Sequence, residues 1–139
     1  MPHILDGKKI AQKLKDQLKI EIENIKIKFK RVPGLAVIQV GNVAASSVYV
    51  KAKTKAAKEV GINVIDHHLE ESTNQNDLIN LINQLNNNDN VNGILVQLPL
   101  PKNININKTL YGYNPKRNQW VPKQVLTKAA AIPFIGLKK

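Results

Sequence analysis

The chain has 139 residues, a hydrophobic content of 42%, no cysteine and a formal net charge of +11. This length predicts one domain with a single core, and the lack of cysteine excludes a disulfide framework and a cysteine-based zinc ribbon. No apolar run approaches the ~20 residues that span a membrane, and the start lacks the apolar core of a signal peptide, so we expect an intracellular protein, cytoplasmic or organellar, without membrane contact.

The first predicted element is a long amphipathic helix that begins near Gly7. Asp6 is a suitable N-cap, and Pro33-Gly34 ends the segment. Apolar residues recur at spacings of three and four, which is typical of one buried helical face. We expect this helix to cover one face of a sheet through Ile10, Leu14, Leu18, Ile22, Ile25 and Phe29.

A buried strand and a second helix follow. The run LAVIQV at 35–40 is almost wholly apolar, as in a strand covered on both faces. Gly41 makes the turn, and a helix is expected up to about Val60, where Gly61 is a C-cap. The predicted core stripe of this helix is Val48, Ala52, Ala56 and Val60.

The remaining elements repeat this alternation. INVIDHHL at 62–69 predicts a second strand, and Thr73 or Asn74 caps a third helix. GILVQL at 93–98 predicts a third buried strand, which PLP at 99–101 ends; one of its two prolines is a candidate for a cis peptide bond. The apolar face of the third helix is Leu78, Leu81, Ile82 and Leu85.

This order predicts an α/β fold with a parallel sheet of three to four strands flanked by helices. Ligands of such sheets bind outside the carboxyl ends of the strands. Those ends are Gly41 and the stretch 97–101. A single glycine after the first strand is far from a glycine-rich dinucleotide fingerprint.

Tyr49 and Lys53 are candidates for chemistry because they lie four apart, on one face of the second helix. The positive helix end, the neighbouring lysines and partial burial beside Tyr49 all favour a neutral amine at Lys53, and a neutral lysine is a base. The alternative is a solvated lysine face, which spacing alone favours.

Gln97 interrupts an apolar strand at its carboxyl end, so it is expected to position Lys53 or a ligand, or to bond loop backbone. His67 and His68 are adjacent in a strand and therefore point to opposite faces. No third ligand stands at suitable spacing, so we expect no metal site.

The positive charge is concentrated at the end of the chain. Residues 1–115 hold 15 bases and 10 acids, and residues 116–139 hold 6 bases and no acid. We therefore expect a folded domain at 1–115 and a divergent basic tail at 116–139. Nucleic-acid binding would need aromatic platforms among the bases, and only six aromatic residues are present, so it is not expected.

Two long stretches resemble one known family. VGNVAASSVYVKAKTKAAKEVGI at 40–62 and GILVQLPLP at 93–101 are similar to the two signatures of the bifunctional methylenetetrahydrofolate dehydrogenase/methenyltetrahydrofolate cyclohydrolases. The stretches ILDGKKIAQKLK at 4–15 and PGLAVIQVG at 33–41 agree in order and spacing. The resemblance covers about residues 4–117.

The resemblance implies an α/β folate-binding domain of the amino-acid-dehydrogenase-like N-terminal type. It implies that Tyr49 stacks on the folate, that Lys53 is the central catalytic group and that Gln97 holds Lys53. Leu98 and Pro99 are then substrate-binding residues. The implied substrates are 5,10-methylene- and 5,10-methenyl-tetrahydrofolate, the product is 10-formyl-tetrahydrofolate, and the family cofactor is NADP. Members are usually homodimers.

The sequence also departs from the family pattern. Asn118 and Trp120 stand where the family has two aspartates, and tryptophan cannot accept a hydrogen bond from a pterin. We expect the NADP-binding domain of the family to be absent from this chain. We therefore expect a chain cut short or frame-shifted after about Arg117. Such a chain is expected to be a homodimer, as the family usually is, or a monomer. The alternative reading is a non-catalytic folate-binding remnant.

Overall fold

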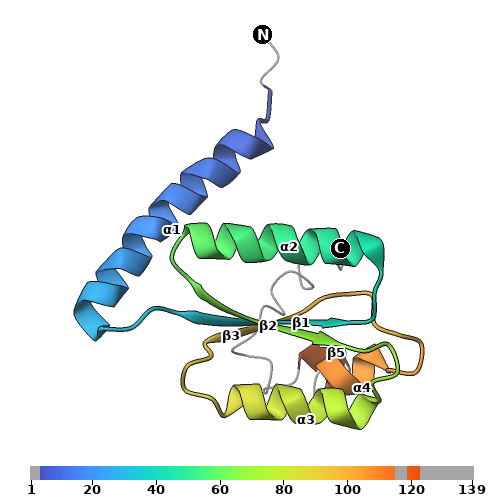
Figure 1. The fold of residues 1–139 in the computed structure, drawn as a ribbon. Helices are drawn as coiled ribbons and strands as arrows, with labels where there is room; N and C mark the ends of the chain where they lie inside the picture. The colour runs from blue at the N-terminus through green and yellow to red at the C-terminus, as the bar shows by residue number, and fades with distance from the viewer. Residues whose placement is uncertain (1–3, 115–118, 123–139) are drawn as a thin grey trace.

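The structure is a computed structural model that describes residues 4–114 and 119–122. Helices and strands alternate through the first three quarters of the chain, as the hydrophobic pattern predicts (Figure 1). The elements are α1 (Gly7–Phe29), β1 (Gly34–Val40), α2 (Ala44–Glu59), β2 (Asn63–Leu69), α3 (Gln75–Asn86), β3 (Gly93–Val96), α4 (Ile106–Leu110), β4 (Tyr111–Asn114) and β5 (Gln119–Pro122).

The first three strands form a parallel sheet in the order β2-β1-β3. Its register pairs Ile38 with His67 on one side and with Val96 on the other. Figure 1 shows α2 on one face of the sheet and α3 on the other. The predicted α/β class is confirmed, with three strands in this sheet, because helical crossovers of this length return the chain in the same direction.

The hydrophobic core lies between the sheet and α3. The predicted apolar face of α3 is confirmed, since Leu78, Ile82 and Leu85 are buried and Leu81 packs against them. Asn74 is the N-cap of this helix and accepts a hydrogen bond from Asp77 N at 2.9 Å. The strands contribute Ala36, Ile38, Val40, Ile94 and Val96, and the loops contribute Val91 and Ile104.

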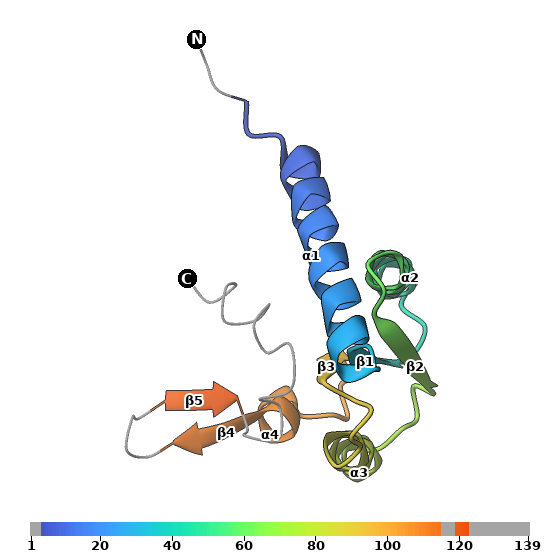
Figure 2. The ribbon, with the colours of Figure 1, turned by 90° about the vertical axis from the view of Figure 1, so that its left-hand side faces the viewer.

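The prediction that α1 covers one face of the sheet is wrong. Ile22 is the buried residue of this helix, whereas Leu14 is 54% exposed and Phe29 is 58% exposed. Figure 2 shows α1 running away from the sheet beyond its crossing with α2. The apolar residues of α1 do lie on one face of the helix, but among the described residues this face is buried only near the crossing, at Ile22.

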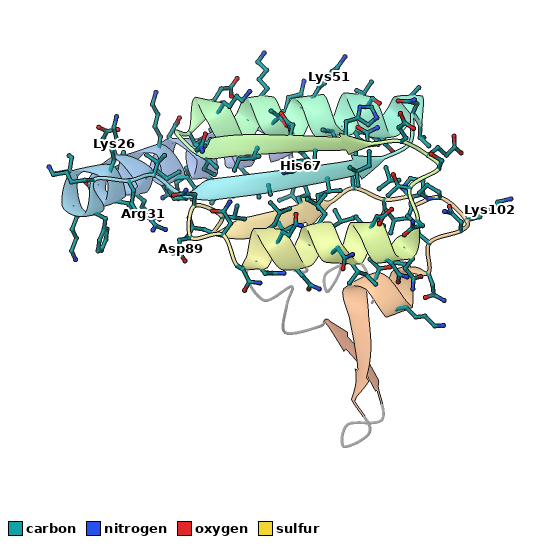
Figure 3. The ribbon with its side chains drawn as sticks, turned by 60° about the horizontal axis from the view of Figure 1, so that its bottom comes forward. Lys26, Arg31, Lys51, His67, Asp89 and Lys102 are labelled. Atoms are coloured by element: carbon teal, nitrogen blue, oxygen red, sulfur yellow. The ribbon has the colours of Figure 1, made fainter. Side chains whose placement is uncertain are left out.

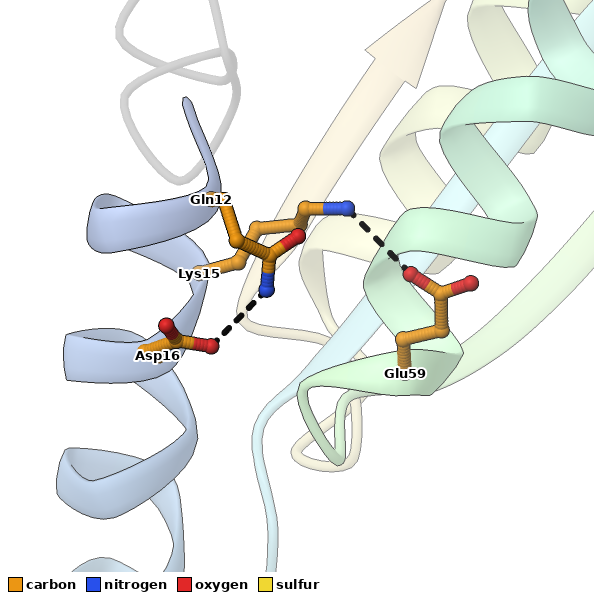
Figure 4. A network of polar contacts seen from close by, with 4 residues as sticks. All are labelled: Gln12, Lys15, Asp16 and Glu59. Atoms are coloured by element: carbon orange, nitrogen blue, oxygen red, sulfur yellow. Dashed lines mark hydrogen bonds and ion pairs between the residues drawn. The ribbon is translucent and has the colours of Figure 1, made fainter. Parts of the chain in front are cut away.

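A surface ion pair accompanies the crossing of α1 and α2. Lys15 Nζ lies 3.4 Å from Glu59 Oε2, and Gln12 bonds Asp16 within α1 (Figure 4). Exposed pairs of this kind contribute at most about 1 kcal/mol. The packing of Ile22 against the Gly61 turn is the apolar part of the same junction, since a Cβ at Gly61 would come within 3.1 Å of Ile22.

The N-cap of α1 is confirmed and gives a local prediction. Asp6 accepts a hydrogen bond from Lys9 N at 3.1 Å. Replacing Asp6 with alanine should cost the helix start about 1 kcal/mol, whereas Asp6→Asn should be close to neutral because asparagine also caps. Since α1 packs weakly, we expect the lower helix stability of Asp6→Ala to appear as faster amide hydrogen exchange in the first turn of α1. Equal exchange in both variants would contradict the capping role.

A hairpin of β4 and β5 follows the sheet, and the sequence pattern does not predict it. The two strands pair antiparallel, with Tyr113 opposite Trp120 in the backbone register. Asn118 lies outside the described residues. No helix in the described part of the chain has both the length and the apolarity needed to cross a membrane.

Candidate active site

The turn between β1 and α2 brings the start of α2 to the carboxyl ends of the strands. Gly41 has a φ of +80°, a conformation that side chains disfavour, and its N–H donates to Leu69 O at 2.9 Å. This bond ties the end of β1 to the end of β2. The chain then enters α2 at Ala44, so that the first turns of the helix lie over the predicted ligand-binding edge.

A hydrogen bond joins Lys53 of α2 to Gln97, the residue that follows β3. Lys53 Nζ donates to Gln97 Oε1 at 2.9 Å, although the two residues are 44 positions apart in sequence. The other end of the amide donates from Nε2 to Leu98 O at 2.8 Å. Gln97 is 9% exposed, and its backbone N–H bonds Ile38 O. Gln97 therefore both holds Lys53 and bonds loop backbone, which combines the two expectations for it.

Tyr49 lies one helical turn before Lys53 and is 58% exposed. Its ring is thus available to a ligand at the rim of the sheet, close to the Lys53–Gln97 pair by helical spacing. The role of each of these residues in binding or catalysis stays a prediction.

The exit of β3 is fixed by two donors and a cis peptide bond. The peptide between Leu98 and Pro99 is cis, so the expected cis proline is the first of the pair. Leu98 O accepts hydrogen bonds from Gln97 Nε2 and, at 3.3 Å, from Ser46 Oγ. Ser46 is 4% exposed, and its hydrogen bond connects the first turn of α2 directly to the residues that follow β3.

The predicted core stripe of α2 is confirmed only at its end, where Val60 is 5% exposed and Ala56 is half-buried. Val48 is 64% exposed and Ala52 is exposed, whereas the buried helical positions are Ser46 and Ala57. Apolar periodicity fails here because several sheet-facing positions carry hydroxyls that bond across the interface, such as Thr54 Oγ1 to Asp66 Oδ1 at 3.1 Å. In the sequence, Ser46 is recognisable only as a serine in the first turn of a helix. Such a serine can cap the helix or contact the core, and the sequence does not distinguish the two.

A second buried glutamine supports the same turn and was not singled out from the sequence. Gln39 is 6% exposed, and its Nε2 donates to Ser47 Oγ at 2.9 Å and to Gly41 O at 3.3 Å. His68 Nε2 donates to the same carbonyl at 2.9 Å. These bonds hold the Gly41 turn from both neighbouring strands, and thereby the start of α2.

A groove opens at the carboxyl ends of the strands, where ligand binding is predicted. Its volume is about 780 Å³, and its walls come from residues 40–43 and 99–103 together with Glu71. A smaller hollow of about 520 Å³ borders Leu98 and Pro99. Pro99 lines both hollows and Leu98 lines the smaller one, whereas Tyr49, Lys53 and Gln97 line neither.

No group of three or more histidine, cysteine, aspartate or glutamate side chains lies within reach of one metal ion in residues 4–114 and 119–122. His67 and His68 occupy consecutive positions of β2, so they face opposite sides of the sheet. The expected absence of a metal therefore stays a prediction.

The comparison with known proteins decides the family. The model of the tetrahydrofolate dehydrogenase/cyclohydrolase catalytic domain matches residues 5–118. The chain belongs to this family. The resemblance of the two long motifs is thereby confirmed, and the signature lysine and glutamine are the two residues that the fold joins at 2.9 Å.

Bacterial relatives share about half of the aligned sequence. The bifunctional protein FolD of Acetivibrio thermocellus is 51% identical over 115 residues, which is 83% of this chain and 40% of that protein. FolD of Agathobacter rectalis is 43% identical over 140 aligned residues, 96% of this chain and 50% of that protein. The chain thus spans about two fifths to one half of the length of these relatives.

Solved structures of the family share the fold. The FolD dehydrogenase/cyclohydrolase of Campylobacter jejuni is 48% identical with a TM-score of 0.73, over 76% of this chain and 37% of that chain. FolD of Trypanosoma brucei, solved with NADP cofactor and an inhibitor, is 32% identical with a TM-score of 0.75. The match covers 79% of this chain and 38% of that chain.

Proposed function

We propose that this chain carries the folate-binding part of a methylenetetrahydrofolate dehydrogenase/cyclohydrolase of one-carbon metabolism, within residues 1–115. The observation that carries the proposal is the 2.9 Å hydrogen bond between Lys53 Nζ and Gln97 Oε1 at the carboxyl ends of the strands. Lys53 is itself exposed, but a hydrogen bond to a buried amide restricts its orientation, as a catalytic group needs.

The proposed reaction at Lys53 is the hydrolysis of 5,10-methenyl-tetrahydrofolate. A water oxygen bonds to the methenyl carbon while Lys53 Nζ takes one proton from that water. The bond from this carbon to N5 then breaks and N5 takes the proton from Lys53, while the remaining hydroxyl proton leaves to solvent as the formyl C=O forms, which gives 10-formyl-tetrahydrofolate. Gln97 accepts one hydrogen of the amine and so directs the nitrogen lone pair of Lys53.

The remaining candidates bind and orient the substrate. Tyr49 offers a largely exposed ring for stacking on the flat part of the folate. Leu98 and Pro99 form the apolar wall beside the Lys53–Gln97 pair. Ser46 and Gln97 fix the Leu98 carbonyl, so the wall and the lysine are held by one set of hydrogen bonds.

NADP is the proposed cofactor of the longer family protein, and the described residues do not fit it. The turn from β1 into α2 has the single glycine Gly41, and the N-cap Val43 makes no side-chain cap bond. This is not the glycine-rich turn that cradles a pyrophosphate. We therefore derive no hydride-transfer step from this chain. A homodimer stays a prediction.

A second candidate is a folate-binding chain without turnover. Trp120 stands at the position of a family aspartate and has no acceptor for the pterin. This candidate shares the binding residues with the first one and differs in having no cyclohydrolase activity.

The deciding experiment follows the absorbance of methenyl-tetrahydrofolate without nucleotide, together with fluorescence titration of a non-hydrolysable folate analogue. We expect Gln97→Leu to lower turnover by roughly 100-fold, because a misplaced catalytic group costs about that much. Gln12→Leu, which removes only the exposed bond to Asp16, is the matched control and should keep full activity. Binding without wild-type turnover would establish the second candidate, and absence of binding would refute both.

A further inference from the structure

A separate groove lies on the other flank of α2, between this helix and β2. Its volume is about 870 Å³, within the range of small-molecule sites. Val37 and Val50 contribute apolar surface, and Ser47, Asp66 and His68 contribute polar groups. Lys53 instead reaches Gln97, beyond β3, and does not line this groove.

Three lysines of α2 border the groove. Lys51, Lys55 and Lys58 follow one another at spacings of four and three, so they form one row along the helix. With a rise of 1.5 Å per residue, the row is about 10 Å long. Figure 3 shows Lys51 projecting outward from α2 above the strand that carries His67. Its flexible stem lets the ammonium group turn over a ligand in the groove.

The three ammonium groups have no carboxylate partner among the described residues, where the ion pair found is Lys15 with Glu59. Two acids, Glu59 and Asp66, also border the groove. Glu59 bonds Lys15 at 3.4 Å across the α1 crossing, and Asp66 accepts the Thr54 hydroxyl at 3.1 Å. The groove walls therefore hold three ammonium groups against two carboxylates, one of which, Glu59, is paired with Lys15.

The polar wall supplies a further donor. Ser47 Oγ accepts a hydrogen bond from Gln39 Nε2 at 2.9 Å, which leaves the hydroxyl hydrogen of Ser47 free to donate. Lysine ammonium groups donate up to three hydrogen bonds each and accept none. The lysine and serine donors at the groove suit an anion.

We propose that this groove binds a phosphate chain, either inorganic or as part of a nucleotide. A row of three lysines about 10 Å long matches several charges in a line better than one compact anion, and lysine binds phosphate as a point charge. The apolar patch of Val37 and Val50 offers a place for a base beside the phosphates. This site is distinct from the proposed folate site and does not depend on it.

The test is isothermal titration calorimetry of the full chain with inorganic tripolyphosphate and, separately, with ATP, at low ionic strength and without divalent metal. We expect saturable one-to-one binding that the double variant Lys51→Gln/Lys55→Gln weakens roughly five- to tenfold, as the loss of two exposed ion pairs predicts. Tighter binding of ATP would show that the apolar patch takes the base, and equal affinities would show that the phosphates alone are bound.

The matched control is Lys9→Gln/Lys13→Gln, which removes the same charge at the same spacing on exposed α1. Equal weakening in the two double variants would overturn the proposal, because net charge alone would then explain binding. Absence of saturable binding to the wild-type chain would overturn it as well. Far-UV circular dichroism of each variant verifies that the fold is retained, and neither outcome depends on folate turnover.

Discussion

In the proposed cyclohydrolase reaction, replacing Lys53 with methionine is expected to lower turnover by about 10³-fold or more, within the range of positioned acid–base groups. Methionine keeps most of the side-chain length and apolar stem but cannot exchange a proton. It leaves Gln97 Oε1 without the donor that it has at 2.9 Å. The measurement is the first-order loss of methenyl-tetrahydrofolate absorbance at saturating substrate, with the substrate's non-enzymatic hydrolysis subtracted.

The control for this result is Lys13→Met, which removes one exposed lysine of α1 and leaves the site untouched. It should retain wild-type turnover, so that a loss at Lys53 cannot be assigned to net charge. Retained turnover in Lys53→Met would refute the catalytic role of this lysine. A large rise in KM at constant kcat would instead identify Lys53 as a group for ground-state binding only.

Replacing Gly34 with alanine is expected to destabilise the fold by about 3 kcal/mol or more. A Cβ at this first residue of β1 would overlap the carbonyl oxygen of Asn90, which is backbone and cannot rotate away. The same residue donates from N to Asn92 Oδ1 at 3.0 Å and accepts from Asn92 N at 2.8 Å. Any shift that relieves the overlap therefore also strains these bonds and the β1–β3 pairing.

Gly7→Ala is the matched control, because a Cβ at Gly7 meets nothing within 4 Å and the residue begins a helix. Alanine there should be neutral or stabilising by up to about 1 kcal/mol. Urea unfolding followed by circular dichroism gives both free energies. Equal stabilities of the two variants would mean that the chain around Asn90 adapts, and would contradict the close packing of this turn.

The sequence predicts the elements well where one period dominates. The strand 35–40 and the helix with Leu78 and Ile82 are found as expected, because a continuous apolar run and a spacing of three and four each have one favourable way to be buried. The same argument fails for α1. Its stripe is as regular as that of α3, but regularity cannot say whether a partner surface is present.

The candidate site is predicted in part. Helical spacing and the odd polar residue in a strand point to Tyr49, Lys53 and Gln97, and the fold brings Lys53 and Gln97 together. Ser46 and Gln39 escape prediction, because a serine in a first helical turn and a glutamine in a strand are both ordinary on a surface. Only their burial, at 4% and 6% exposure, shows that their hydrogen bonds act inside the protein.

By itself, the sequence determined the alternation of helices and strands, the parallel sheet and the family, because periodicity and long motifs are local properties of the chain. The tertiary structure alone decided which flank of α2 faces the sheet, how far α1 projects, and that Lys51, Lys55 and Lys58 border a groove while Lys53 does not. The physical reason is that burial and hydrogen bonding depend on residues far away in the sequence. Lys53 is a candidate catalytic residue because Gln97 lies opposite it, and Lys51, Lys55 and Lys58 are candidate binding residues because they border a groove.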